Sequence, residues 1–197
     1  MKRIFLGDTL DIVKRCILSS LSPIGLWTVC PMFTDNFTND DDVDTYEILI
    51  GARVLTRSVI DNRYQNRDAY FNPYKKFKGH LFLDPDTGIK TKKSSSGHNK
   101  YIYENELLGI INNRTSHLTL VFDQSYSNDE KPINIISKAI SDKFNNLAQN
   151  KVYYCAYVSH AIFMLFGRDL ALIEKGVFEL RKNSNLPESR FLKSYTT

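Results

Sequence analysis

Two carboxylates separated by a proline follow a short apolar run near the middle of the chain. Residues 80–83 read His-Leu-Phe-Leu, and residues 84–88 read Asp-Pro-Asp-Thr-Gly. An apolar run of this length that ends at a turn is typical of a buried strand in a parallel sheet. Ligands of open α/β sheets bind outside the carboxyl ends of the strands, so Asp84 and Asp86 are predicted to be catalytic. The alternative is that both residues only shape the turn, since Asp and Gly are common there.

Three other apolar runs also end in polar residues that can do chemistry. They are residues 24–32, followed by Asp35; residues 118–122, followed by Asp123, Gln124 and Ser125; and residues 152–157, followed by Ser159 and His160. Residues 161–166 either continue the last of these strands or pair beside it. Carboxylate, amide, hydroxyl and imidazole groups together suit acid/base or water-activating chemistry.

Helical periodicity is predicted between these strands. Asp8 is a suitable N-cap for a helix over residues 8–20, and further helices are expected around 46–53, 103–111, 136–147 and 169–180. Residues 34–45 and most of 54–79 are expected to be irregular. Alternating strands and helices bring the carboxyl ends of the strands to one edge. The sequence therefore predicts one α/β domain over residues 1–197, a three-layer Rossmann-like sandwich with a mostly parallel central sheet of four or five strands.

Basic residues flank the acidic turn on both sides in the sequence. The candidates for contacts with nucleic-acid phosphates are Lys75 and Lys76 before the turn, and Lys92, Lys93, Ser94, Ser95 and Lys100 after it. Tyr101 can stack on a base. The alternative is a solvated lysine loop, which is the usual role of such a stretch.

Composition limits the class of protein. The chain has 197 residues, 42% of them hydrophobic, and a formal net charge of +4, which suits one well-buried core. No apolar run approaches the roughly 18–20 residues of a membrane span, and no signal peptide is expected, so we expect a cytoplasmic protein. Cys16, Cys30 and Cys155 lack metal-ligand spacing and are expected to be core residues rather than disulfide partners or zinc ligands.

Several motifs are absent from the sequence. It contains neither GxGxxG nor GxxxxGK[ST], the phosphate-binding loops of dinucleotide and nucleoside-triphosphate enzymes. It also lacks HExxH, the deaminase zinc signature and the GxSxG elbow. A metal-dependent nuclease is disfavoured because the expected hairpin with an acid-x-lysine strand is not visible.

The turn at residues 84–88 resembles the first motif of the uracil-DNA glycosylase superfamily, which reads GQDPYxG in one branch. Residues 157–161, Tyr-Val-Ser-His-Ala, are similar in placement to the second motif, HPSP. Asp123-Gln124 lies where that branch carries an asparagine that reads the flipped base. The likeness spans residues 80 to about 163. The first motif here lacks the GQ, an acid replaces its tyrosine, and an additional strand precedes it.

This resemblance implies a DNA glycosylase that needs no cofactor and no metal. Asp84, Asp86 and His160 would be catalytic, and Asp123, Gln124, Tyr101, Asp35 and Asp8 would bind the base. An acid in place of the tyrosine leaves room for a larger, hydroxylated base. The expected substrate is therefore a modified base such as glucosylated or hydroxymethylated cytosine in double-stranded phage DNA, and the expected role is antiviral defence. Neither a membrane nor an obligate protein partner is expected.

Two alternatives remain open. Asp84-Pro85 after an apolar strand also resembles the DPPY motif of adenine N6-methyltransferases, and the helix after Gly7-Asp8 precedes the first strand as in some ribosomal-RNA members. No glycine-rich turn for S-adenosylmethionine follows that first strand. The other alternative is a DNA-binding module without enzymatic activity.

Overall fold

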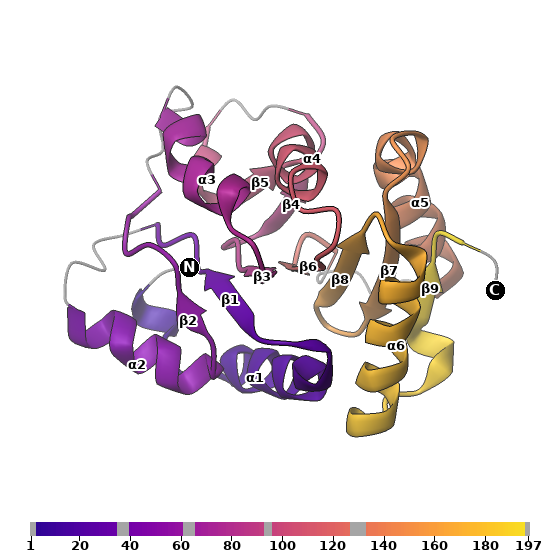
Figure 1. Cartoon of the computed structure of the whole chain (residues 1–197), viewed down its shortest axis with the longest axis horizontal. Coiled ribbons are helices and arrows are strands. Elements are labelled where there is room, and N and C mark those ends of the chain that lie inside the picture. Colours follow the sequence, from indigo (N-terminus) through magenta and orange to yellow (C-terminus); the bar gives the residue numbers. More distant parts are fainter. Residues whose placement is uncertain (1–2, 35–39, 61–65, 93–95, 127–132, 196–197) are drawn as a thin grey trace.

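A central sheet with helices on both faces organises the chain (Figure 1). The computed structural model describes residues 3–34, 40–60, 66–92, 96–126 and 133–195. Within them the sheet strands are β1 (Trp27–Cys30), β2 (Arg53–Val54), β3 (His80–Leu83), β6 (Thr119–Asp123), β7 (Tyr153–Val158), β8 (Ile162–Gly167) and β9 (Phe191–Lys193). Two further short strands, β4 (Gly88–Lys90) and β5 (Tyr101–Tyr103), pair in parallel with each other.

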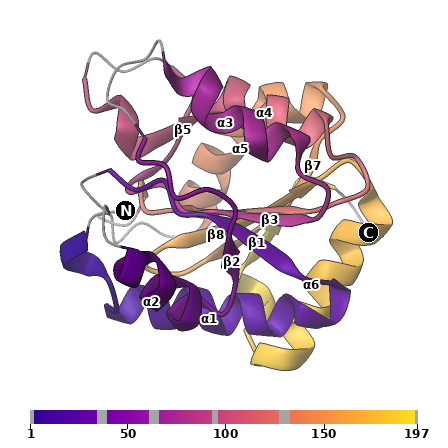
Figure 2. The ribbon, with the colours of Figure 1, turned by 60° about the vertical axis from the view of Figure 1, so that its left-hand side comes forward.

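The helices form the two outer layers of a three-layer α/β sandwich. They are α1 (Thr9–Leu21), α2 (Asp40–Ile50), α3 (Arg67–Lys76), α4 (Glu104–Asn112), α5 (Ile133–Gln149) and α6 (Leu170–Ser184). Figure 2 shows α1, α2 and α6 on one face of the sheet and α3, α4 and α5 on the other. Short 3-10 turns include η1 (Arg3–Phe5) before α1 and η4 (His98–Lys100) before β5. No helix in the described ranges is both long enough and apolar enough to cross a bilayer.

The strand order in the described sheet is β2-β1-β3-β6-β8-β7-β9. Strands β2, β1, β3 and β6 are parallel, whereas β8 pairs antiparallel with both β6 and β7. The predicted mostly parallel α/β sandwich is therefore confirmed, and the sheet has more strands than the four or five expected. Residues 161–166, for which two arrangements were open, pair beside β7 through a tight hairpin.

Alternation along the central strands divides the core between the two faces. Phe82 packs with the apolar side chains of α1 and α6, while its neighbours Leu81 and Leu83 pack on the α4 and α5 side. Phe122 and Val121 divide in the same way along β6. Because both faces are covered by helices, the central strands are apolar at nearly every position, as buried parallel strands are.

Two helices differ from the sequence prediction. Helix α2 begins at Asp40, inside the acidic stretch expected to be a loop. Acids are favourable in the first turn of a helix because they offset its dipole. Helix α3 occupies part of the segment expected to be irregular, although Pro73 lies within it.

The N-cap Asp8 of α1 and the N-cap Asp169 of α6 are confirmed. Cys30 and Cys155 are buried as predicted, but Cys16 is exposed.

A buried histidine lies where the parallel strands begin. The Nδ1 atom of His80 accepts a hydrogen bond from the backbone N–H of Leu118 at 3.0 Å, so its proton is on Nε2, which lies 3.1 Å from the carbonyl oxygen of Ile24. Burial lowers the pKa of His80, and the positive charge of Arg114 acts in the same direction. His80 is therefore built into the fold as a neutral side chain.

We expect acidification to destabilise the fold through His80. The unfolded chain binds a proton at His80 near pH 6.5, whereas the folded chain resists it, so this contribution to the free energy of unfolding is complete above pH 6.5 and is lost as the pH falls toward the lower folded-state pKa. Urea denaturation at a series of pH values from 7.5 to 5 measures how steeply the free energy of unfolding changes with pH. His80→Gln should make the free energy of unfolding less dependent on pH than it is in the wild type. An identical slope in wild type and His80→Gln would contradict this assignment.

Candidate functional site

The carboxyl ends of four strands meet at one edge of the sheet, as predicted. Strand β7 runs parallel to β1, β3 and β6 because β8 is antiparallel to both β6 and β7. The connection from β1 leads outward to β2, whereas the connection from β3 leads toward β6 on the other side. This reversal makes the gap between β1 and β3 a topological switch point, where open α/β sheets bind their ligands.

A pocket opens at this edge, between the N-terminal end of α1 and the residues that follow β3 and β6. Its cavity volume is about 140 Å³. It is lined by Phe5, Asp8, Leu10, Asp11, Lys14, Asp84, Pro85, Asp86, Phe122 and Gln124. The structure therefore brings together four of the predicted site residues, namely Asp8, Asp84, Asp86 and Gln124.

A buried ion network forms one wall of the pocket. The Nζ atom of Lys14 lies 2.9 Å from Oδ2 of Asp84 and 3.0 Å from Oδ1 of Asp11. The hydroxyl of Tyr46 also donates to Oδ2 of Asp84, at 2.9 Å. Lys14 lies over the ring of Phe122, 4.6 Å from its centroid. All three charged side chains are at most 5% exposed, so each depends on the others for its charge compensation.

The two carboxylates keep Lys14 charged. Burial alone would lower the pKa of this ammonium, but the negative charges and hydrogen bonds of Asp84 and Asp11 outweigh burial and raise the pKa. Burial also raises the pKa of Tyr46, and the charge of Asp84 adds to the effect. Tyr46 therefore stays neutral and acts as a hydrogen-bond donor.

The first turns of α1 supply the acids on the helix side of the pocket. Asp8 caps the helix, and its Oδ1 accepts from the backbone N–H groups of Leu10 at 2.9 Å and of Asp11 at 3.1 Å. The backbone N–H of Gly7 donates to Oδ2 of Asp11 at 2.9 Å. Asp8, Asp11 and Lys14 are spaced three residues apart, so they share one side of the helix.

The pocket is strongly anionic in formal charge. Among the described residues that line it, Asp8, Asp11, Asp84 and Asp86 are carboxylates and Lys14 is the one ammonium. Such an arrangement favours a positive charge over a negative one at the same place. In the part of the chain that the structure describes, no three His, Cys, Asp or Glu side chains are grouped so that they could hold a metal ion.

Asp123 belongs to a second ion network beside the pocket. Its carboxylate accepts from the backbone N–H groups of Ile89 at 3.2 Å and Ser125 at 2.7 Å and lies 3.0 Å from Nζ of Lys143. Gly88, with φ of +142°, lets this carboxylate approach, since a Cβ there would lie 2.0 Å from Oδ1 of Asp123. Asp123 is fully buried and does not line the pocket, although it was predicted to bind the base.

Two other predicted residues lie outside the pocket. His160 is exposed on the hairpin between β7 and β8, at the same edge but beyond the intervening β8. Tyr101, in β5, carries Nζ of Lys90 over its ring at 4.4 Å. Asp35 lies outside the described residues.

The basic candidates separate into two groups. Lys92 and Lys100 are both exposed, and Lys100 lies close to the pocket edge, where the backbone N–H of Thr87 donates to its carbonyl at 2.8 Å. Lys92 follows the far end of β4. Lys75 and Lys76 end α3 and lie at the opposite edge, where β3 begins, although the sequence places them beside the acidic turn. Lys93, Ser94 and Ser95 lie outside the described residues.

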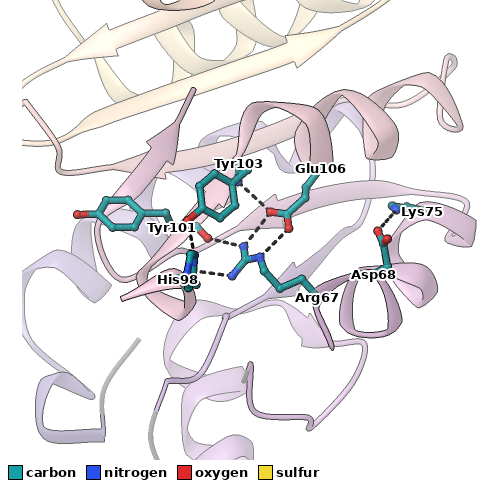
Figure 3. A network of polar contacts seen from close by, with 7 residues as sticks. All are labelled: Arg67, Asp68, Lys75, His98, Tyr101, Tyr103 and Glu106. Carbon is teal, nitrogen blue, oxygen red and sulfur yellow. Dashed lines mark hydrogen bonds and ion pairs between the residues drawn. The ribbon is translucent and has the colours of Figure 1, made fainter. Parts of the chain in front are cut away.

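A buried arginine ties the segment around Lys100 to the helical layer (Figure 3). Nε of Arg67 lies 2.6 Å from Oε1 of Glu106, and the same guanidinium donates to the carbonyls of His98 and Tyr101, both at 2.6 Å. The carboxylate of Glu106 also accepts from the backbone N–H of Tyr103 at 2.8 Å. This network fixes the backbone from His98 to Tyr103 next to the pocket edge.

Sequence reasoning missed three residues of the site. Lys14, Asp11 and Tyr46 lie far from the acidic turn in sequence, and the contact between Lys14 and Asp84 spans 70 positions. The available signal was the spacing of Asp11 and Lys14, which places two charges on the same helix face as the apolar Leu18 and Leu21.

Comparisons with known proteins do not assign the chain to a family. No family model, no curated protein and no solved structure matches it.

We expect the Arg67 network to be important for stability. Replacing Arg67 with Met leaves the carboxylate of Glu106 buried without its partner, which should lower the free energy of unfolding by about 3–5 kcal/mol. Urea denaturation at pH 7 measures this loss. Arg181 and Glu188 form a matched but exposed pair, with both nitrogen-oxygen distances at 2.9 Å, so Arg181→Met should cost less than about 1 kcal/mol. Equal losses in the two variants would refute the buried role of Arg67.

Proposed function

We propose that the chain is a DNA glycosylase that removes a modified base, such as hydroxymethylated or glucosylated cytosine of phage DNA, and leaves an abasic site. The observation that carries the proposal is the anionic pocket at the carboxyl ends of β3 and β6, beside the start of α1. Hydrolysis of an N-glycosidic bond passes through a sugar with oxocarbenium character, which carries positive charge. Four carboxylates around a small cavity favour that charge.

Asp86 is the best candidate for the water-activating carboxylate. It is half-buried and lines the pocket, whereas Oδ2 of Asp84 already accepts from Lys14 and Tyr46. In the proposed reaction the water oxygen forms a bond to C1′, Asp86 takes the water proton, and the bond from C1′ to the base nitrogen breaks. The electron pair of that bond leaves with the base. Asp84 is assigned the stabilisation of positive charge on the sugar.

Lys14 replaces His160 as the candidate for stabilising the departing base. His160 is exposed beyond β8, whereas the ammonium of Lys14 lies in the pocket wall. Lys14 stays protonated because two carboxylates flank it and its pKa is raised. A protonated amine cannot attack C1′ to form an imine, so the product should be an intact strand with an abasic site.

Base excision requires the nucleotide to leave the duplex, which costs a few kcal/mol. Contacts to the phosphates on either side can offset this cost. Lys100 is exposed near the pocket edge, and the Arg67 network fixes the backbone next to it. Lys92 is exposed past the far end of β4. The basic segment after β4 is therefore the proposed contact with the DNA backbone.

A nucleic-acid methyltransferase is the second candidate, favoured by the strand order. Asp84-Pro85 ends a strand beside the switch point, and a reversed strand, β8, lies between the last two parallel strands. This arrangement resembles the sheet of S-adenosylmethionine-dependent methyltransferases. The residues present do not fit that cofactor: residues 31–34 after β1 do not line the pocket, Met32 and Phe33 are fully buried, and no carboxylate directly follows β2. We therefore derive no methyl-transfer step.

The proposal predicts that the protein releases free base from modified DNA without added metal or cofactor. The protein is incubated with unmodified DNA, uracil-containing DNA and phage DNA with modified cytosines, and released bases are identified by mass spectrometry. Asp86→Asn should lower the rate about 100-fold or more, since it removes the general base. Asp142→Asn, at an exposed position on α5, should leave the rate unchanged.

The second candidate is tested on the same substrates with isotopically labelled S-adenosylmethionine. Transfer of label to the DNA would replace the glycosylase proposal with the methyltransferase. Binding of DNA with neither released base nor transferred label would favour a DNA-binding module. Strand cleavage without alkali treatment would contradict the role given to Lys14.

A further inference from the structure

A larger groove lies at the opposite edge of the sheet from the pocket. Its volume is about 670 Å³, within the usual range of small-molecule sites. It runs between the end of α1, the start of β1, the turn from α2 to β2 and the residues just before β3. None of the residues that line it belongs to the anionic pocket.

The groove carries positive charges without acidic partners. Arg15, Arg53 and Lys78 line it, and no Asp or Glu is among its described lining residues. Arg15 donates to the carbonyls of Ile48 at 3.2 Å and Leu49 at 3.4 Å, and Lys78 donates to the carbonyl of Asn113 at 3.2 Å. Carbonyl acceptors at helix C-termini fix the direction of these side chains and offset only part of their charge, since a helix end carries about half an elementary charge.

Glycines keep part of the groove open. Gly51, with φ of +71°, has no atom within 4 Å of the position where a Cβ would lie, so the space above it is free. Gly25, with φ of +142°, packs against His80, and a Cβ there would lie 2.9 Å from Cδ2 of that ring. Both positions need a backbone conformation that favours glycine, and a larger residue at either would strain the fold.

One side of the groove is apolar. Trp27 forms part of its wall, and the side chain of the neighbouring Leu26 is 93% exposed. A groove with cations and an apolar surface offers contacts to both the phosphates and the base of a nucleotide.

We propose that this groove binds a phosphate-bearing ligand of nucleotide size. Three cations attract phosphate, and none of the described residues that line the groove is a carboxylate. The proposal does not depend on the glycosylase activity, because no residue of the pocket takes part. Free nucleotides and the backbone of a nucleic-acid strand share this chemistry, and the experiment below distinguishes them.

The test uses Trp27, the single tryptophan of the chain. The full-length protein is titrated with ADP and, separately, with a ten-nucleotide oligothymidine, while Trp27 fluorescence and calorimetric heat are recorded. We expect saturable binding of at least one ligand that weakens with salt. Arg53→Ala and Lys78→Ala should each raise its Kd about tenfold, as loss of a charge-assisted hydrogen bond does. Lys182→Ala, on the exposed side of α6, is the matched control and should not change the Kd.

The ligand that binds identifies the source of the phosphate. Tight binding of ADP assigns the groove to a free nucleotide, and binding of the oligonucleotide alone assigns it to a strand. No saturable binding of either ligand would overturn the proposal. Equal affinity in wild type, Arg53→Ala and Lys78→Ala would also overturn it, as would stronger binding of polyglutamate than of both phosphate ligands. Arg53 is exposed, and its side chain makes no hydrogen bond or ion pair with the described residues, so its variant should fold normally.

Discussion

The ammonium of Lys14, held between the carboxylates of Asp11 and Asp84, connects the N-terminal helix to the centre of the sheet. A charge this deeply buried is tolerated only when partners compensate it, so the helix has to sit where Lys14 reaches Asp84. That position defines one wall of the pocket and brings Asp8 to its rim. The hydroxyl of Tyr46 adds a neutral donor to the same carboxylate and links α2 to the network. Changing any member therefore alters both stability and the shape of the pocket.

The carboxyl ends and the amino ends of the parallel strands differ in charge, and the topology explains this difference. The start of α1 and the turn after β3 carry the acids, while the first residue of β2 and the turn before β3 carry Arg53 and Lys78. Helices α1, α2 and α3 run from the first edge to the second, so their C-terminal carbonyls gather where these cations lie. The reversed strand β8 moves the end of β7 away from the pocket. The site is consequently built from β3, β6 and α1, and His160 has no part in its wall.

The sequence allowed much of the fold and part of the site to be predicted. Short apolar runs and their turn residues located β1, β3, β6 and β7, and Asp8 and Asp169 marked helix starts, because these signals are local. Helix α3 was missed because Pro73 and its aromatic residues obscure the period. The pairing of Lys14 with Asp84 depends on tertiary packing across 70 positions, which no local pattern encodes. The separation of Lys75 and Lys76 from the acidic turn likewise follows from strand direction, which reverses the position of neighbours in sequence.

The close approach of Gly88 to Asp123 determines from which side the pocket can widen. Because a Cβ at position 88 would overlap that carboxylate, the turn after β3 is packed directly against the end of β6. The backbone N–H of Gln124 also donates to the carbonyl of Thr87 at 2.8 Å, which joins the same two segments by a hydrogen bond. The opposite wall includes Phe5, in the single turn η1, which has no buried residue and is joined to α2 by the ion pair of Arg3 with Asp42 at 2.8 Å. A ligand too large for the cavity would therefore have to displace this exposed turn and break its ion pair, so the turn rather than the acidic loop sets the limit on ligand size.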